Sequence, residues 1–178
     1  MQLSALLAEM EFQSNAFVAF CNNIPEEKFF TQPPVKWSVA QNVAHLITSA
    51  SMTRIAYRLP KFIIRWYTGK PNRHSRSYDE LVSKYKRKLE EGGKASGKFN
   101  TPPVKIEKGK ERIVKDFSTA MNLLHKTIGK QWKDDQLDNY LAPHPLLGKI
   151  TQRELLYFTI YHIHHHKQII SERLAEQI

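Results

Sequence analysis

Apolar residues recur at intervals of three and four positions in four long segments of this chain, and this spacing constrains the fold most. Such spacing places the apolar side chains on one face of an α-helix. We therefore expect long helices over about 3–24, 39–59 and 113–128, and from 151 to near the C-terminus. No segment shows the alternation that is typical of a β-strand. The sequence predicts an all-α protein, an up-down four-helix bundle.

Three predicted helix starts carry a capping box, in which a Ser or Thr and a Gln or Glu three residues later bond each other's backbone amides. The pairs are Ser38–Gln41, Ser77–Glu80 and Thr151–Glu154. The pair at Ser77 predicts an additional helix that ends near Gly92. An apolar, aromatic run at 62–67 predicts another short one. We thus expect one or two short extra helices in the connection between the second and third long helices.

Positive charge is concentrated in the middle of the chain. Residues 54–130 contain 20 Lys or Arg and 7 Asp or Glu, whereas the whole chain of 178 residues has 27 and 17. We interpret the chain as a single domain, 1–178, with a basic irregular insertion at about 61–110. Most charged runs face solvent, so nucleic acid is not an expected partner. The alternative is that this region binds nucleic acid or another anionic partner.

The composition excludes several classes of protein. Cys21 is the single cysteine, so neither an internal disulfide nor a Cys-rich zinc site can form. The apolar runs are too short to span a bilayer, and the first residues lack the basic segment of a secretory signal. We expect a cytoplasmic protein with no membrane partner.

Four of the eight histidines lie within residues 161–166 of the last predicted helix. At about 100° per residue, His162 and His166 fall on the same apolar face, His164 points to the opposite side and His165 lies at the boundary. Two imidazoles at positions i and i+4 can bind one metal ion together. The alternative is a pair of core histidines with ordinary hydrogen-bond partners.

His45 is the best candidate for a third ligand. It lies in the middle of the second long helix, on a face whose other residues are small or polar and leave room for a pocket. Ligands in helical bundles converge from facing helices. Three histidines that leave a coordination position open are typical of a catalytic metal site.

Three motifs carry a resemblance to a known family: KWSVAQNVAHL at 36–46, HPLLGKIT at 144–151 and HIHHHKQI at 162–169. With them the chain resembles the DinB/YfiT-like superfamily of metalloenzymes. The resemblance implies a four-helix bundle with one divalent ion, often nickel, zinc or iron. One histidine of the second helix and an HxxxH pair of the last bind it, here His45, His162 and His166. Some relatives transfer low-molecular-weight thiols such as bacillithiol or isomerise through mycothiol, and others are labelled hydrolases.

These observations predict a metal-dependent enzyme that acts on a small molecule, either a thiol S-transferase, which would also use a low-molecular-weight thiol, or a hydrolase. The sequence assigns no catalytic residue beyond the metal ligands. We interpret His144, which precedes Pro145, as a structural turn residue, with a role near the open end of the bundle as the alternative. Two rival functions stay open: a non-catalytic binding protein that uses the basic middle region, and a homodimerisation module with a vestigial metal site.

Overall fold

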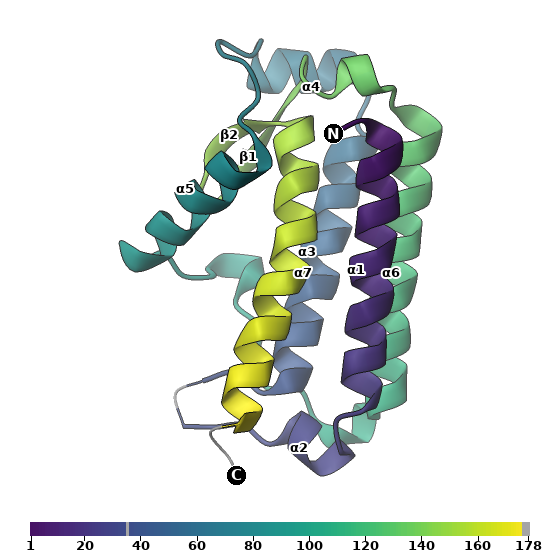
Figure 1. Cartoon of the computed structure of the whole chain (residues 1–178), viewed down its shortest axis with the longest axis vertical. Helices are drawn as coiled ribbons and strands as arrows, with labels where there is room; N and C mark the ends of the chain where they lie inside the picture. Colours follow the sequence, from purple (N-terminus) through teal and green to yellow (C-terminus); the bar gives the residue numbers. More distant parts are fainter. Residues whose placement is uncertain (35, 176–178) are drawn as a thin grey trace.

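Four long helices stand side by side in the computed structural model, which describes residues 1–34 and 36–175 (Figure 1). They are α1 (Leu3–Asn22), α3 (Val39–Arg58), α6 (Lys110–Gln131) and α7 (Gln152–Ala175). The predicted all-α bundle is confirmed. Its core is built from the apolar stripes that the sequence showed, including Leu6, Met10, Phe17, Val43, Leu46, Phe117, Leu124, Leu155 and Phe158. No helix within these described ranges is long and apolar enough to cross a membrane.

The helices do not alternate strictly in direction. Lys110 Nζ, at the start of α6, donates to the carbonyl of Ile24 just after α1, 2.8 Å away, so α1 and α6 are antiparallel. The indole of Trp132, just after α6, donates to the carbonyl of Tyr57 near the end of α3. Thus α3 and α6 run in the same direction. The expected up-down order holds for α1–α3 and α6–α7, but the connection at 59–109 carries the chain back along the bundle before α6 begins.

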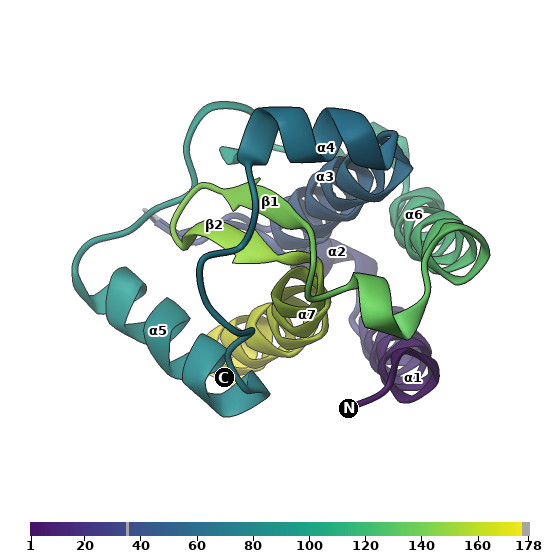
Figure 2. The same ribbon diagram turned by 90° about the horizontal axis from the view of Figure 1, so that it is seen from above.

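Short elements fill the connections between the long helices. They are α2 (Glu26–Phe30), α4 (Lys61–Thr68), α5 (Tyr78–Glu90) and the 3₁₀ turns η1 (Gly97–Phe99), η2 (Ile106–Lys108) and η3 (Asp134–Gln136). Helices α4 and α5 are the extra helices that the sequence predicted. Helix α4 lies across one end of the bundle, and α5 lies outside α7 (Figure 2). Tyr85 anchors α5, since its ring packs edge-on against Phe158 and Tyr161 of α7.

A small antiparallel hairpin precedes α7 and corrects the expectation that the chain has no strand. Its strands, β1 (Leu141–His144) and β2 (Gly148–Thr151), pair Leu141 with Thr151 and His144 with Gly148. Each strand has only four residues, too few for a clear alternation, and Pro143 made β1 look like a loop. Gly148 has a φ of 74°, which a glycine adopts without strain after the turn.

The predicted capping boxes are present at the three helix starts. Ser38 and Gln41 bond each other's backbone amides, as do Ser77 and Glu80. At the start of α7 the Thr151 amide donates to Glu154, and the Glu154 amide donates to the Thr151 hydroxyl. These side chains fix where α3, α5 and α7 begin.

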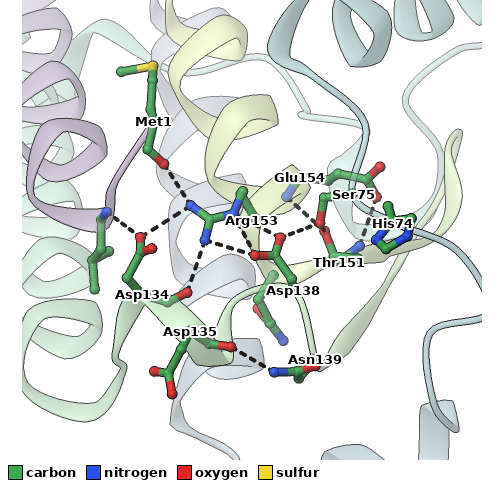
Figure 3. Close-up of polar contacts among 12 residues, drawn as sticks. Met1, His74, Ser75, Asp134, Asp135, Asp138, Asn139, Thr151, Arg153 and Glu154 are labelled. Carbon is green, nitrogen blue, oxygen red and sulfur yellow. Dashed lines mark hydrogen bonds and ion pairs between the residues drawn. The ribbon is translucent and has the colours of Figure 1, made fainter.

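Ion pairs of Arg153 and of the buried Glu154 hold the first turn of α7 in place (Figure 3). The Arg153 guanidinium donates to both carboxylate oxygens of Asp138, at 2.8 and 2.9 Å, and to Asp134 and the Met1 carbonyl. The fully buried Glu154 carboxylate accepts two hydrogen bonds from the Arg73 guanidinium, at 2.7 and 2.8 Å. We call Arg73, Arg76, Asp134, Asp138, Arg153 and Glu154 the ion network.

Candidate metal centre

Three histidines from two helices meet inside the bundle. His45 lies in the middle of α3, and His162 and His166 lie one turn apart on α7, all buried. His162 Nε2 is 3.2 Å from His45 Nε2 and 3.0 Å from His166 Nε2. We call these residues the histidine cluster. The structure brings together the three residues that the sequence selected, and their ring nitrogens could hold a metal ion.

The outer nitrogens of two rings are tied to acceptors. His45 Nδ1 is 2.9 Å from the backbone carbonyl of Phe99, and His166 Nδ1 is 2.7 Å from Asn42 Oδ1. A carbonyl oxygen can only accept, so Nδ1 of His45 carries the hydrogen. The Asn42 orientation is fixed in turn, because its Nδ2 donates to the Ser38 carbonyl at 2.8 Å. Each of these two rings, when neutral, therefore presents an unprotonated Nε2 to the cluster.

The facing nitrogens fit a metal ion better than they fit each other. Lone pairs of His45 and His166 both point toward His162 Nε2, which can offer at most one hydrogen. Nitrogens about 2.0–2.1 Å from a common ion at tetrahedral to octahedral angles lie about 2.8–3.4 Å apart. The observed 3.0 and 3.2 Å separations fall in this range. The donor set is thus suited to one divalent ion.

Burial keeps the histidine cluster neutral. Desolvation lowers the pKa of His45, against the raising effect of its hydrogen bond to Phe99. The pKa values of His162 and His166 lie well below the ordinary value, first because of burial and then because of the neighbouring histidines. Neutral imidazoles are the form that binds metal.

The remaining histidines of α7 lie where the helical spacing placed them. His164 is exposed and His165 is half-buried. Only His162 and His166 of this run reach the interior, as the sequence predicted.

A cavity of about 470 Å³ opens beside the histidine cluster and is lined by all three of its rings. This volume is in the range of small-molecule sites. Asn42, Ser49, Met52 and Ala56 line it, which confirms that the small or polar face of α3 leaves room for a pocket. No Asp or Glu lines it among the described residues.

His144 also lines this cavity, so the structure supports both readings of it. Its Nδ1 accepts hydrogen bonds from the backbone amides of Leu146 and Leu147, at 3.2 and 3.1 Å, and so holds the hairpin turn. Its ring centroid is 4.2 Å from that of Phe158. Burial, followed by the charge of Lys84, lowers the pKa of His144 to about 4.

The basic insertion contributes to the site through its backbone, which the sequence did not reveal. Besides the Phe99 carbonyl, the Thr101 carbonyl accepts a hydrogen bond from Gln41 Nε2 at 3.0 Å. Residues 93–96, 99 and 100 line the cavity. A backbone carbonyl is present at every position, so residue types could not identify this contact.

Comparison with known proteins finds a family match. A family model described as the DinB superfamily matches residues 9–170. No curated protein and no solved structure matches the chain.

Proposed function

The chain belongs to the DinB superfamily, and from this premise we propose that it is a metal-dependent enzyme acting on a small molecule. In this proposal one divalent ion is bound by His45, His162 and His166. The observation that carries it is the convergence of three Nε2 atoms beside a cavity of about 470 Å³. Imidazole ligands suit nickel, zinc and iron alike.

The protein's own residues hold the ligand rings in place. The Phe99 carbonyl orients His45, and Asn42 orients His166, so both rings keep the tautomer that a metal requires. When bound, the ion would act as a Lewis acid that lowers the pKa of water or stabilises a thiolate. All three rings line the cavity, so a substrate there can reach the centre.

Transfer of a low-molecular-weight thiol to a small electrophile is the reaction we favour, with hydrolysis as the second possibility. The cavity has no carboxylate among its described lining residues to serve as a general base. A thiol, with a pKa of about 8.5, loses its proton more easily than water and depends less on such a base.

We also propose a cytoplasmic location. Cys21 is a buried free thiol, which is in keeping with a reducing compartment.

Metal content tests the proposal directly. Protein purified without a His-tag should contain about one divalent ion per chain by elemental analysis, as expected for three converging imidazoles. His45→Ala and His162→Ala should lose it, whereas His164→Ala should keep it because this side chain is exposed. A chelator should lower the melting temperature of the parent but not of His162→Ala. Retention of metal by His162→Ala would refute the assigned ligands.

A further inference from the structure

We propose that the cavity beside the histidine cluster binds an anionic small molecule with an apolar body, and that His144 donates a hydrogen bond to its anionic group. The inference rests on the proposed function, since it names the substrate class of the same site. Three features of the cavity support it: the hydrogen-bonding state of His144, the charge of the lining and its apolar surface.

His144 is held as a donor. Two backbone amides, of Leu146 and Leu147, donate to its Nδ1, which must therefore be unprotonated. The hydrogen of the neutral ring then lies on Nε2. Within the described part of the chain Nε2 has no hydrogen-bond partner, and it is not among the fully buried atoms. A neutral N–H group facing a ligand site selects a hydrogen-bond acceptor.

The position of His144 brings this donor close to the histidine cluster. The ring packs against Phe158, and Phe158 in turn stacks on His162 with a centroid distance of 4.7 Å. The turn amides and the Phe158 ring fix the imidazole from two sides. A molecule within reach of the cluster is therefore also within reach of His144, as the shared cavity lining shows.

The charged side chains that line the cavity are all cationic. Lys36, Lys94 and Arg173 line it, and no Asp or Glu does so among residues 1–34 and 36–175. Lys94 belongs to the basic insertion and is exposed, so its ammonium group is accessible to an entering ligand. Charge of a single sign attracts ligands of the opposite sign and disfavours cations.

The rest of the lining is largely apolar and aromatic. It includes Trp37, Tyr85, Leu89, Phe99, Leu146, Phe158 and Ile169. Such a surface gains from contact with an apolar body, and it gives little to a small inorganic anion. The combination selects a molecule with an anionic head and an apolar body.

Three probes that share one apolar chain separate these contributions: octanoate, octan-1-ol and octylamine. Isothermal titration calorimetry is done on the full chain as purified, and again after chelation so that a metal cannot attract the carboxylate. In both forms octanoate should bind about tenfold more tightly than octan-1-ol, because a hydrogen bond to a charged group is worth about that factor or more. Octylamine should show no measurable binding.

Substitutions then assign the preference to residues. His144→Asn keeps an acceptor for the turn amides but removes the Nε2 donor, so the affinity for octanoate should fall about tenfold. The affinity for octan-1-ol should fall less, because its neutral hydroxyl accepts a weaker hydrogen bond. His164→Asn, on the exposed face of α7, is the matched control and should behave as the parent. Lys94→Glu changes an exposed side chain that cannot disturb the core, and it should weaken octanoate and admit octylamine.

Several results would overturn the inference. They are equal affinities for octanoate and octan-1-ol, no binding of any probe, or a His144→Asn variant that is folded and binds octanoate as the parent does. If that variant does not fold, an unchanged preference in Lys94→Glu still refutes the charge argument. The failure of this inference can be distinguished from the failure of the proposed function. If the protein binds no metal but the chelated form still prefers octanoate, the proposed function fails and this inference stands.

Discussion

The start and the middle of α7 bury polar groups in opposite ways. In the ion network near its start, Arg153 and Glu154 meet groups of opposite charge, and each carboxylate oxygen of Glu154 accepts hydrogen bonds. In the histidine cluster, two and a half turns further along, like atoms face each other across 3.0 and 3.2 Å. A buried group that is fully paired needs no ligand to satisfy it. A buried set of facing acceptors favours a ligand that supplies the missing positive charge.

Acid should distinguish the two regions, because each loses its contribution to the free energy of unfolding in a different pH range. Burial lowers the pKa values of His45, His162 and His166 in the folded chain, whereas an unfolded imidazole titrates near about 6.5. Below that pH the unfolded chain binds more protons, so the free energy of unfolding falls, by up to about 1.4 kcal/mol per pH unit for each histidine. Over two units the loss reaches several kcal/mol, the largest effect expected here.

The ion network should respond only in stronger acid. Burial raises the pKa values of Glu154 and Asp138, but their hydrogen bonds, chiefly to Arg73 and Arg153, outweigh it, so both pKa values are lowered. The contribution of these carboxylates to the free energy of unfolding is therefore complete above about 4 and is lost as the pH falls further. Urea unfolding of the chelated protein between pH 7.5 and 3 measures both phases. His162→Ala should make the first phase shallower. A single loss that begins only near pH 4 would contradict the contrast between the two regions.

Glu154→Gln tests whether the ion network is purely structural. It leaves Arg73 and Arg76 without their buried partner and should lower the free energy of unfolding by about 3 kcal/mol. Metal content per folded molecule should stay unchanged, because the histidine cluster lies further along α7. Asp116→Asn removes an exposed pair with Arg112 and should cost at most about 0.5 kcal/mol. Loss of metal from folded Glu154→Gln would show that the regions are coupled.

The sequence predicted one of these regions better than the other. His45, His162 and His166 could be selected because helical periodicity alone places them on interior faces. Glu154 could be predicted only as a helix cap. Its partners Arg73 and Arg76 lie about 80 residues away in an irregular segment, and no local pattern encodes that pairing.

The same limit applies to the fold. The long helices follow from apolar spacing, and their starts follow from capping pairs, both of which are local. The β1–β2 hairpin and the shared direction of α3 and α6 depend on contacts between distant segments. So does the Phe99 carbonyl that orients His45, 54 residues away in the chain.

Asn42→Ala tests whether the side chain that orients His166 supports metal binding by the histidine cluster. It removes the acceptor 2.7 Å from His166 Nδ1, so the ring loses its orientation and the metal affinity should fall about 10- to 100-fold. Asn42→Asp keeps an acceptor and should restore most of that affinity. Ser49→Ala should have a smaller effect, because the Ser49 hydroxyl is 3.4 Å from His162 Nδ1. Competition with a coloured chelator measures all three. Equal affinity in Asn42→Ala and the parent would argue against metal at this centre.

The smallest effect on stability is expected from the outer face of α5. Its charged side chains belong neither to the ion network nor to the histidine cluster. Replacing Lys86, Arg87 and Lys88 by Gln removes only exposed pairs such as Arg87–Glu91, 3.9 Å apart, and should change the free energy of unfolding by at most about 0.5 kcal/mol. Lys84 must be left in place, because its ammonium donates to the Leu147 carbonyl at 3.0 Å and ties α5 to the hairpin.

The same triple variant decides between a solvated basic face and nucleic-acid binding. A solvated face predicts no gel shift with DNA or RNA for either protein, and equal metal content in both. Binding driven by phosphate contacts would weaken steeply as salt rises, and the loss of three cations would flatten that dependence. Gel shifts at two salt concentrations compare the two outcomes. Tight, salt-sensitive binding by the parent that disappears in the triple variant would identify α5 as a binding surface, because none of the three side chains contacts the histidine cluster or lines its cavity.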